Sequence, residues 1–190
     1  MVGNNAVHGV DLQQVAGLVG LDYDSRPQLS PAELRNRQAV LLSILDRAID
    51  RIPESVHGTK IPGRDRTIWN LVEHMCEIAS VYQRVATGIS IFDATAADAE
   101  VNGELSSVQL HSSIKDLTMR LSAETLDYER RVETYFGVAS LHYVLERSTW
   151  HIAQHLRQLA SLMCDVDPSI MPEIDAKLLA GLPIPIEVWD

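Results

Sequence analysis

The stretch WHIAQHLRQL, residues 150–159, places two histidines four residues apart in a run that otherwise favours a helix. Four residues turn an α-helix by about 40° more than one full turn, so His151 and His155 are expected on one face, one turn apart. Leu159 follows them on the same face. The pair therefore lies on or beside the apolar stripe of a helix predicted from about residue 140 to about residue 164.

Two further helices are predicted upstream by their end signals and their apolar periodicity. The first begins at Ser30, an N-cap serine followed by a proline and, three positions after the cap, by Glu33, and it stops before Pro53. The second begins near residues 65–67 and ends at Gly88, where a glycine is typical of the position after a helix. Apolar residues recur at steps of three and four in both segments, which predicts one buried face for each helix.

A third amphipathic helix is predicted between these two and the helix that carries the histidine pair. It begins near residue 106, runs to about Phe136 with a bend or interruption near Ser122, and ends at Gly137. The preceding residues 89–105 are polar and small, which indicates a long connection of the kind that often carries function. We find no strong strand signal in this part of the chain. The pattern predicts an all-α protein, a four-helix bundle.

The bundle is expected to span residues 30–165, with a short extension at each end. Residues 1–29 form the N-terminal extension, and residues 166–190 form the C-terminal one. The latter is predicted to hold one short helix near residues 173–180, after which two prolines favour an extended path. Trp189 is expected to fold back on the bundle, because its large ring has much apolar surface to bury.

Composition and charge narrow the classes of function. The chain is 46% hydrophobic and 22% charged, an ordinary globular balance. Its net charge of −10 argues against binding to nucleic acids and to anionic membrane surfaces. No apolar run is long enough to span a membrane and no signal-peptide pattern is found, so a cytoplasmic protein is expected. Cys76 and Cys164 are both expected as small buried residues, with one disulfide possible.

A zinc-type site needs a third protein ligand beside His151 and His155, and His74 is the best candidate. It lies beside the apolar stripe of the second predicted helix, and facing helices of a bundle approach within about 8–10 Å. Three histidines placed in this way would leave one coordination position open. The alternative is that they are hydrogen-bonded core residues or partly exposed ones. The remaining histidines are expected to be surface or structural residues: His8, His57, His111 and His142.

The segments WNLVEHMCEIA, residues 69–79, and ERSTWHIAQHLRQL, residues 146–159, resemble those of the DinB-like superfamily. Its members include mycothiol-dependent maleylpyruvate isomerases and bacillithiol transferases, and the resemblance covers roughly residues 30–165. The resemblance implies a four-helix bundle whose three histidines hold a divalent metal ion, commonly zinc or nickel, with open coordination. The corresponding positions of this chain are all filled, by His74, His151 and His155.

Two further segments, PGRDRT at residues 62–67 and LPIPIEVWD at residues 182–190, resemble a bacterial subgroup of this superfamily. In that subgroup a glutaredoxin-like domain precedes the DinB-like one. Residues 2–24 resemble the last strand, turn and helix of that glutaredoxin-like unit. No Cys-x-x-Cys and no earlier strands precede them here, so the redox domain is expected to be absent. Its thiol–disulfide activity is therefore not transferred to this chain.

The chemistry that the resemblance implies is the activation of a low-molecular-weight thiol by the metal ion. The leading hypothesis is a metal-dependent transferase or isomerase that acts on a small-molecule thiol and an electrophilic substrate, in a homodimer. A metal-dependent hydrolase and a non-catalytic metal- or ligand-binding stress protein are the alternatives, and no general base is assigned. Arg64 or Arg66 of the loop before the second helix is a candidate contact for an anionic substrate.

Overall fold

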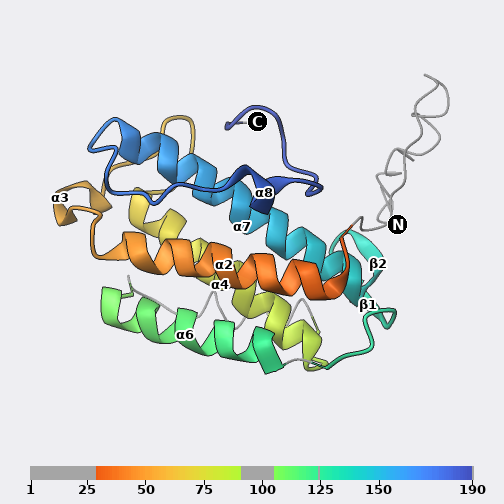
Figure 1. The fold of residues 1–190 in the computed structure, drawn as a ribbon. Helices are drawn as coiled ribbons and strands as arrows, with labels where there is room; N and C mark the ends of the chain where they lie inside the picture. Colours follow the sequence, from red (N-terminus) through yellow and green to blue (C-terminus); the bar gives the residue numbers. More distant parts are fainter. Residues whose placement is uncertain (1–28, 91–104, 124, 190) are drawn as a thin grey trace, which may run out of the picture.

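The computed structural model describes residues 29–90, 105–123 and 125–189. Four long helices form the predicted bundle, and labels follow Figure 1. These helices are α2 (Pro31–Ile49), α4 (Ile68–Ala86), α6 (Ser107–Ala123) and α7 (Leu141–Cys164). Both α2 and α4 pack against α6 and against α7, so α6 and α7 occupy opposite corners of the bundle. The short elements are α3 (Glu54–His57), β1 (Arg131–Thr134), β2 (Gly137–Ser140) and α8 (Ala176–Leu179).

The predicted helix ends are confirmed, because the residues that signal them make the expected hydrogen bonds. Ser30 forms a capping box with Glu33, whose carboxylate accepts from the Ser30 backbone N–H at 2.9 Å. Thr67 caps α4 in the same way. Gly88 has φ 97°, and the N–H of the next residue donates to the Arg84 carbonyl at 3.0 Å, which is the Schellman pattern. Local sequence therefore defines where α2 and α4 begin and where α4 ends.

The core lies between the apolar faces of the four helices and is rich in leucine. Burial of each such side chain stabilises the fold by roughly 1.5–3 kcal/mol. A polar contact crosses this core: the Gln38 amide of α2 donates to the Ser148 hydroxyl of α7 at 3.0 Å. That hydroxyl donates in turn to the Ile78 carbonyl of α4 at 3.4 Å. Since Ser148 lies one turn before the first histidine of the pair, this contact aligns the two helices that carry the candidate ligands.

The third helix is shorter than predicted, and it is followed by a small hairpin that the sequence did not signal in an otherwise all-α fold. α6 ends at Ala123, and β1 and β2 form an antiparallel hairpin in which Thr134 pairs with Gly137. Gly137 has φ 112°, which favours glycine at the end of the turn. Arg130 explains why the chain leaves the helix, because its guanidinium donates to the carbonyls of Val85 and Ala86, both at 3.0 Å. These contacts satisfy carbonyls at the end of α4, a tertiary benefit that helical periodicity does not reveal.

The C-terminal segment runs back along α7, as predicted for Trp189. Its backbone carbonyls accept hydrogen bonds from Arg157, at 2.7 Å to Pro185 and 2.8 Å to Ile186. The Val188 carbonyl accepts from the Gln154 amide of α7 at 2.7 Å. The predicted short helix is present as α8, over fewer residues than expected. The segment that follows α8 is therefore attached to the middle of α7, next to the histidine pair.

Two predictions concern segments that the structure does not describe. The N-terminal extension lies outside the described residues except for Leu29, and so does the connection between residues 91 and 104. Among the described residues, no helix is both long and apolar enough to cross a bilayer.

Cys76 is buried as predicted, whereas Cys164 is exposed, because it is the last residue of α7 and the apolar stripe ends before it. Both thiols are free, so the possible disulfide is not formed.

Candidate metal centre

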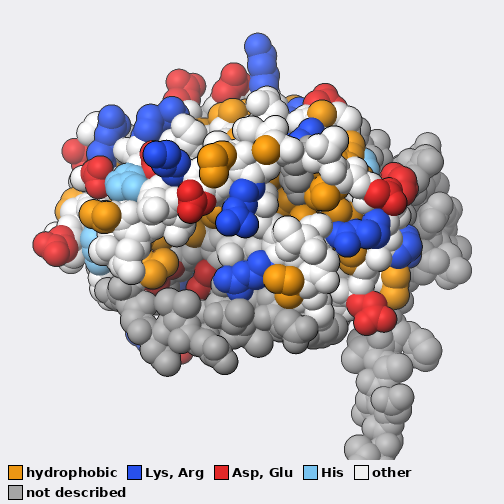
Figure 2. Space-filling model, turned by 90° about the horizontal axis from the view of Figure 1, so that it is seen from below, with side chains coloured by type: hydrophobic (Ala, Val, Ile, Leu, Met, Phe, Trp, Pro, Cys, Tyr) orange, Lys and Arg blue, Asp and Glu red, His pale blue; other side chains and the backbone are white. Residues whose placement is uncertain are grey.

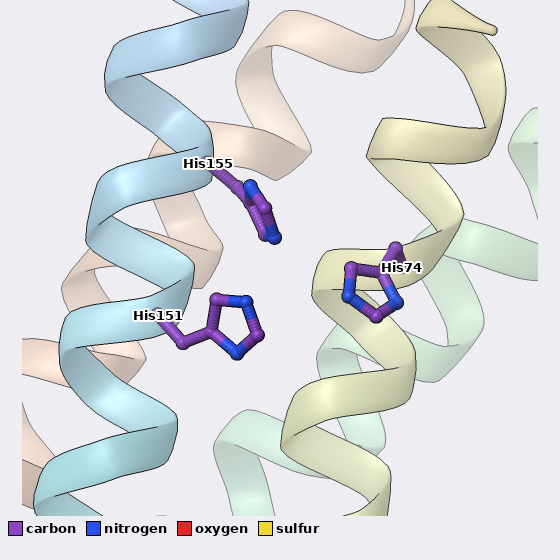
Figure 3. Close-up of side chains that lie close together, drawn as sticks. All are labelled: His74, His151 and His155. Atoms are coloured by element: carbon purple, nitrogen blue, oxygen red, sulfur yellow. The ribbon is translucent and has the colours of Figure 1, made fainter. Parts of the chain in front are cut away.

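Three histidines from two helices converge at one point of the bundle. His74 lies on α4, and His151 and His155 lie on α7. Figure 3 shows the three rings turned toward the space between the two helices. The ring centroids are separated by 5.6 Å and 5.2 Å from His74 to His151 and His155, and by 4.6 Å within the pair. One nitrogen of each ring lies within 4.8 Å of the other two, which is close enough for all three to hold one metal ion.

The position of the cluster follows from where each histidine lies on its helix. His74 precedes Met75, which is fully buried, and follows Leu71, which is 1% exposed. It therefore lies at the edge of the buried stripe, and its side chain is 25% exposed. His151 and His155 are also only partly buried. A site at the edge of the core is accessible to a small molecule and is still largely shielded from water.

Hydrogen bonds fix the orientation of two of the rings. The Glu77 carboxylate can only accept, so it accepts from Nδ1–H of His74 at 2.9 Å and leaves the Nε2 lone pair free. The Gln158 side-chain oxygen accepts from Nδ1–H of His155 at 2.8 Å. The Gln158 amide nitrogen donates to the Val188 carbonyl at 3.1 Å, which fixes the direction of its oxygen. Contacts of this kind are typical of histidines that bind metals.

The second ring nitrogen of His155, Nε2, is one of the few buried polar atoms that lack a hydrogen-bond partner among the described residues. An unpartnered buried polar atom costs about 1–3 kcal/mol, so its position calls for an explanation. A metal ion shared with the other two rings would provide the missing partner. The donor set also fits such an ion, since imidazole nitrogen is a preferred ligand of zinc and nickel.

The histidines of α7 are held in the uncharged form that binds metal ions. Burial, followed by the proximity of the other two histidines and of Arg147, lowers the pKa of His151 to about 3. Burial is also the main cause that lowers the pKa of His155 to about 4, although its bond to Gln158 acts in the opposite direction. Both rings are therefore neutral near pH 7, and protons compete little with a cation at these two positions.

The cluster opens into a cleft of about 560 Å³. Its walls combine the histidines with two tryptophans, Trp150 of α7 and Trp189 of the C-terminal segment, and with Arg64 and Arg66. The sequence suggested Arg64 or Arg66 as a contact for an anionic substrate and predicted that Trp189 folds back. It did not indicate that Trp189 lines this cleft. A second cleft of about 520 Å³ lies between α4 and α6, and it contains no cluster of histidines.

A role for Glu77 was not predicted from the sequence, although its spacing from His74 is a usable signal. It follows His74 by three residues, so the two side chains meet on one face of α4. The tilt of side chains in a helix made this contact predictable once His74 was chosen as a ligand. No comparable local signal leads to Val188, because thirty residues separate it from Gln158.

The other histidines have structural contacts, as predicted. His57 stacks on Trp69 with ring centroids 3.9 Å apart. His142 bonds to the backbone carbonyl that precedes α2, at 2.7 Å. His111 links α6 to the carboxylates of Asp46 in α2 and of Asp50, the residue that follows α2. His8 lies outside the described residues. Within the part of the chain that the structure describes, only the cluster of three histidines has the geometry of a metal site built from histidine, cysteine or acidic groups.

Comparisons with known proteins support the fold and leave the chemistry open. No protein-family model and no curated protein matches the chain. Among solved structures, it is similar to the crystal structure of a proposed DinB family member from Exiguobacterium sibiricum 255-15. The TM-score is 0.57 at 20% sequence identity, and the match covers 77% of this chain and 97% of that one. The chain therefore has the DinB-like fold that its sequence predicts, whereas the resemblance to glutaredoxin fusion proteins stays a prediction.

Proposed function

We propose that the chain binds one divalent metal ion, zinc or nickel, through His74, His151 and His155, and that it is a thiol-dependent transferase or isomerase. The observation that carries the proposal is the meeting of three ring nitrogens within 4.8 Å at the wall of an open cleft. Zinc sites that are purely structural use four protein ligands, whereas catalytic sites use three and keep one position open. A site with three histidines and an adjacent cleft belongs with the second kind.

A divalent ion held by three neutral imidazoles keeps its full charge, and it supplies a position at which a bound thiol loses its proton. The residues of this chain orient and shield that position. Glu77 and Gln158 hold two of the rings in place. Trp150 and Trp189 form apolar walls of the cleft, which keep water away from the reacting groups. Its substrates would be a small thiol and an electrophile, and a homodimer remains the expected assembly.

The first test is elemental analysis of untagged protein as purified and after incubation with zinc or nickel, followed by removal of excess ion. We expect roughly one ion per chain in the parent and a loss of bound metal in His155→Ala, which removes one of the three ligands. His142→Gln is the matched control, since it changes a histidine of the same helix that lies outside the cluster. An absence of metal from the parent after both incubations would overturn the proposal.

Turnover assays then separate the candidate reactions. Thiol consumption that requires both the metal ion and an electrophile would support the transferase or isomerase. Metal-dependent turnover in the absence of any thiol would instead favour a hydrolase that uses bound hydroxide. Metal binding without turnover of either kind would favour a non-catalytic binding protein. Each assay should be repeated with His155→Ala, so that activity from contaminating metal or protein is recognised.

A further inference from the structure

Two arginines line the wall of the cleft, and the charge of one of them, Arg66, interacts with the Glu77 carboxylate beyond ion-pair distance. Arg64 and Arg66 lie in the loop between α3 and α4 and line the same cleft as the three histidines. Neither guanidinium donates a hydrogen bond to the described residues or forms an ion pair with them. Asp65 between them is exposed and pairs with Lys60 at 2.5 Å, so it does not neutralise them. The donors of both guanidinium groups are therefore available to a molecule in the cleft.

Other arginines of the chain are used differently. Arg37, Arg130 and Arg157 each donate to backbone carbonyls of a distant segment and so hold the fold together. Arg66 is partly buried without such a contact, and its burial lowers its pKa. Taking a charged group out of water is costly unless it is paired. The charge of Glu77 offsets part of this cost, and a ligand in the cleft would provide the direct hydrogen-bond partner that the Arg66 guanidinium lacks among the described residues.

The charge in the cleft contrasts with the rest of the molecule. The chain as a whole carries a net charge of −10. On the face seen in Figure 2, acidic and basic side chains are interspersed with scattered apolar ones. Around the histidine cluster three arginines, Arg64, Arg66 and Arg147, act on the histidines, and the Glu77 carboxylate that accepts from His74 is the opposing negative charge. A local positive potential within an acidic protein attracts small anions to this cleft.

The apolar walls complete the contacts that a small organic molecule needs. Trp150 and Trp189 border the cleft, and Pro185 lies beside them. The Arg147 guanidinium lies over the Trp150 ring, 5.5 Å from its centroid, and restrains that wall. A cleft of about 560 Å³ is within the usual size range for small-molecule sites. Aromatic walls combined with a few fixed charges are typical of such sites.

We propose that this cleft binds a small organic oxyanion, of the carboxylate or phosphate type, through Arg66 and Arg64, with its apolar part between Trp150 and Trp189. Guanidinium groups match the geometry of both anions by pairs of parallel hydrogen bonds. Such an anion would be the substrate of the transferase or isomerase proposed above. Only its conversion rests on that proposed function, and its binding does not. Binding of the anion to the arginines does not require the metal ion, so it can be tested separately.

The test uses tryptophan fluorescence of the full chain, before and after loading with zinc. Three probes of similar apolar size are titrated: 3-phenylpropionate, phenyl phosphate and the neutral 3-phenylpropanol. We expect at least one of the two anions to bind about tenfold more tightly than the alcohol, the low end of what a charge-assisted hydrogen bond contributes. The better anion identifies the preferred group. Arg66→Gln should abolish the preference, whereas Arg120→Gln, an exposed arginine on α6, should retain it.

Equal affinity for the anions and the alcohol in the parent would overturn the proposal, and so would an anion preference that survives in Arg66→Gln. Arg66→Lys provides a second check, because it keeps the charge and loses the fork of donors, so it should restore only part of the preference. Failure of this inference is distinct from failure of the proposed function. If the chain prefers anions but binds no metal, the anion site stands and the proposed function fails. If it binds metal but shows no anion preference, the metal site stands and the anion site fails.

Discussion

Gln158 is expected to control metal affinity although it is not a ligand. It is 7% exposed, accepts from Nδ1–H of His155 at 2.8 Å and donates to the Val188 carbonyl at 3.1 Å. Replacement by leucine keeps the approximate volume and removes both contacts. The His155 ring would then lose the bond that fixes its orientation and its tautomer. The free Nε2 atom would no longer be held toward the other two histidines.

The expected loss is about 10- to 100-fold in zinc affinity, the usual effect of removing such a partner of a metal-binding histidine. This range corresponds to about 1.4–2.7 kcal/mol of binding free energy. The magnitude follows from the geometry, since one of three ligands is loosened and none is lost. Gln158→Leu should therefore bind zinc more weakly than the parent and more tightly than His155→Ala.

The assay is competition between the protein and a chromophoric zinc chelator, with thermal unfolding measured in parallel. Gln154→Leu is the matched control, since Gln154 also donates to the Val188 carbonyl, at 2.7 Å, but its side-chain hydrogen bonds go to no histidine among the described residues. We expect the two variants to lose similar thermal stability and only Gln158→Leu to lose zinc affinity. Gln158→Glu should keep more of the affinity than Gln158→Leu, because its carboxylate still accepts from His155 although it no longer donates to Val188. Equal losses of affinity in both leucine variants would refute the reasoning.

Two further predictions concern groups outside the cluster. Burial raises the pKa of the Cys76 thiol to about 12, whereas Cys164 is exposed. Iodoacetamide at pH 8 should therefore add one label to the folded chain, detected by mass spectrometry, and none to Cys164→Ser until it is denatured. Hydrogen bonds to Asp50 and Asp46 raise the pKa of His111. The protonated ring thus stabilises the fold at pH values below its unfolded pKa of about 6.5, and this contribution is lost as pH rises through the higher folded value. Chemical unfolding should show a larger difference between the parent and His111→Gln at pH 5.5 than at pH 8.5, and a difference that does not depend on pH would contradict this assignment.

The sequence predicted those helices whose limits are set locally. Ser30 and Gly88 act within one turn of the helices that they begin and end, so their effect can be read from neighbouring residues. The hairpin was missed because each of its strands has four residues, too few for alternation to stand out. Its position depends on Arg130, which reaches carbonyls of α4 some forty-five residues earlier in the chain. Such a contact competes with local helix preference only in the folded state.

In the candidate site too, the features set by local sequence were predicted, and those set by contacts between distant segments were not. The spacing of His151 and His155 predicted that they share a face, and the apolar stripe around His74 predicted that it faces them. Their convergence follows from helix geometry and from the packing of α4 against α7. The residues that orient the rings depend on individual side-chain rotamers and on the path of the C-terminal segment. Periodicity carries no information about either.

The C-terminal segment connects the two parts of the site. The Val188 carbonyl accepts hydrogen bonds from both Gln154 and Gln158, so one backbone group contacts the residue that orients His155. The next residue, Trp189, lines the cleft beside the arginines. A shift of this segment would therefore change the wall that contacts the substrate and the orientation of one metal ligand at the same time. Metal affinity and anion affinity are thus expected to be coupled, because any ligand that holds Trp189 in place also holds Gln158 against His155.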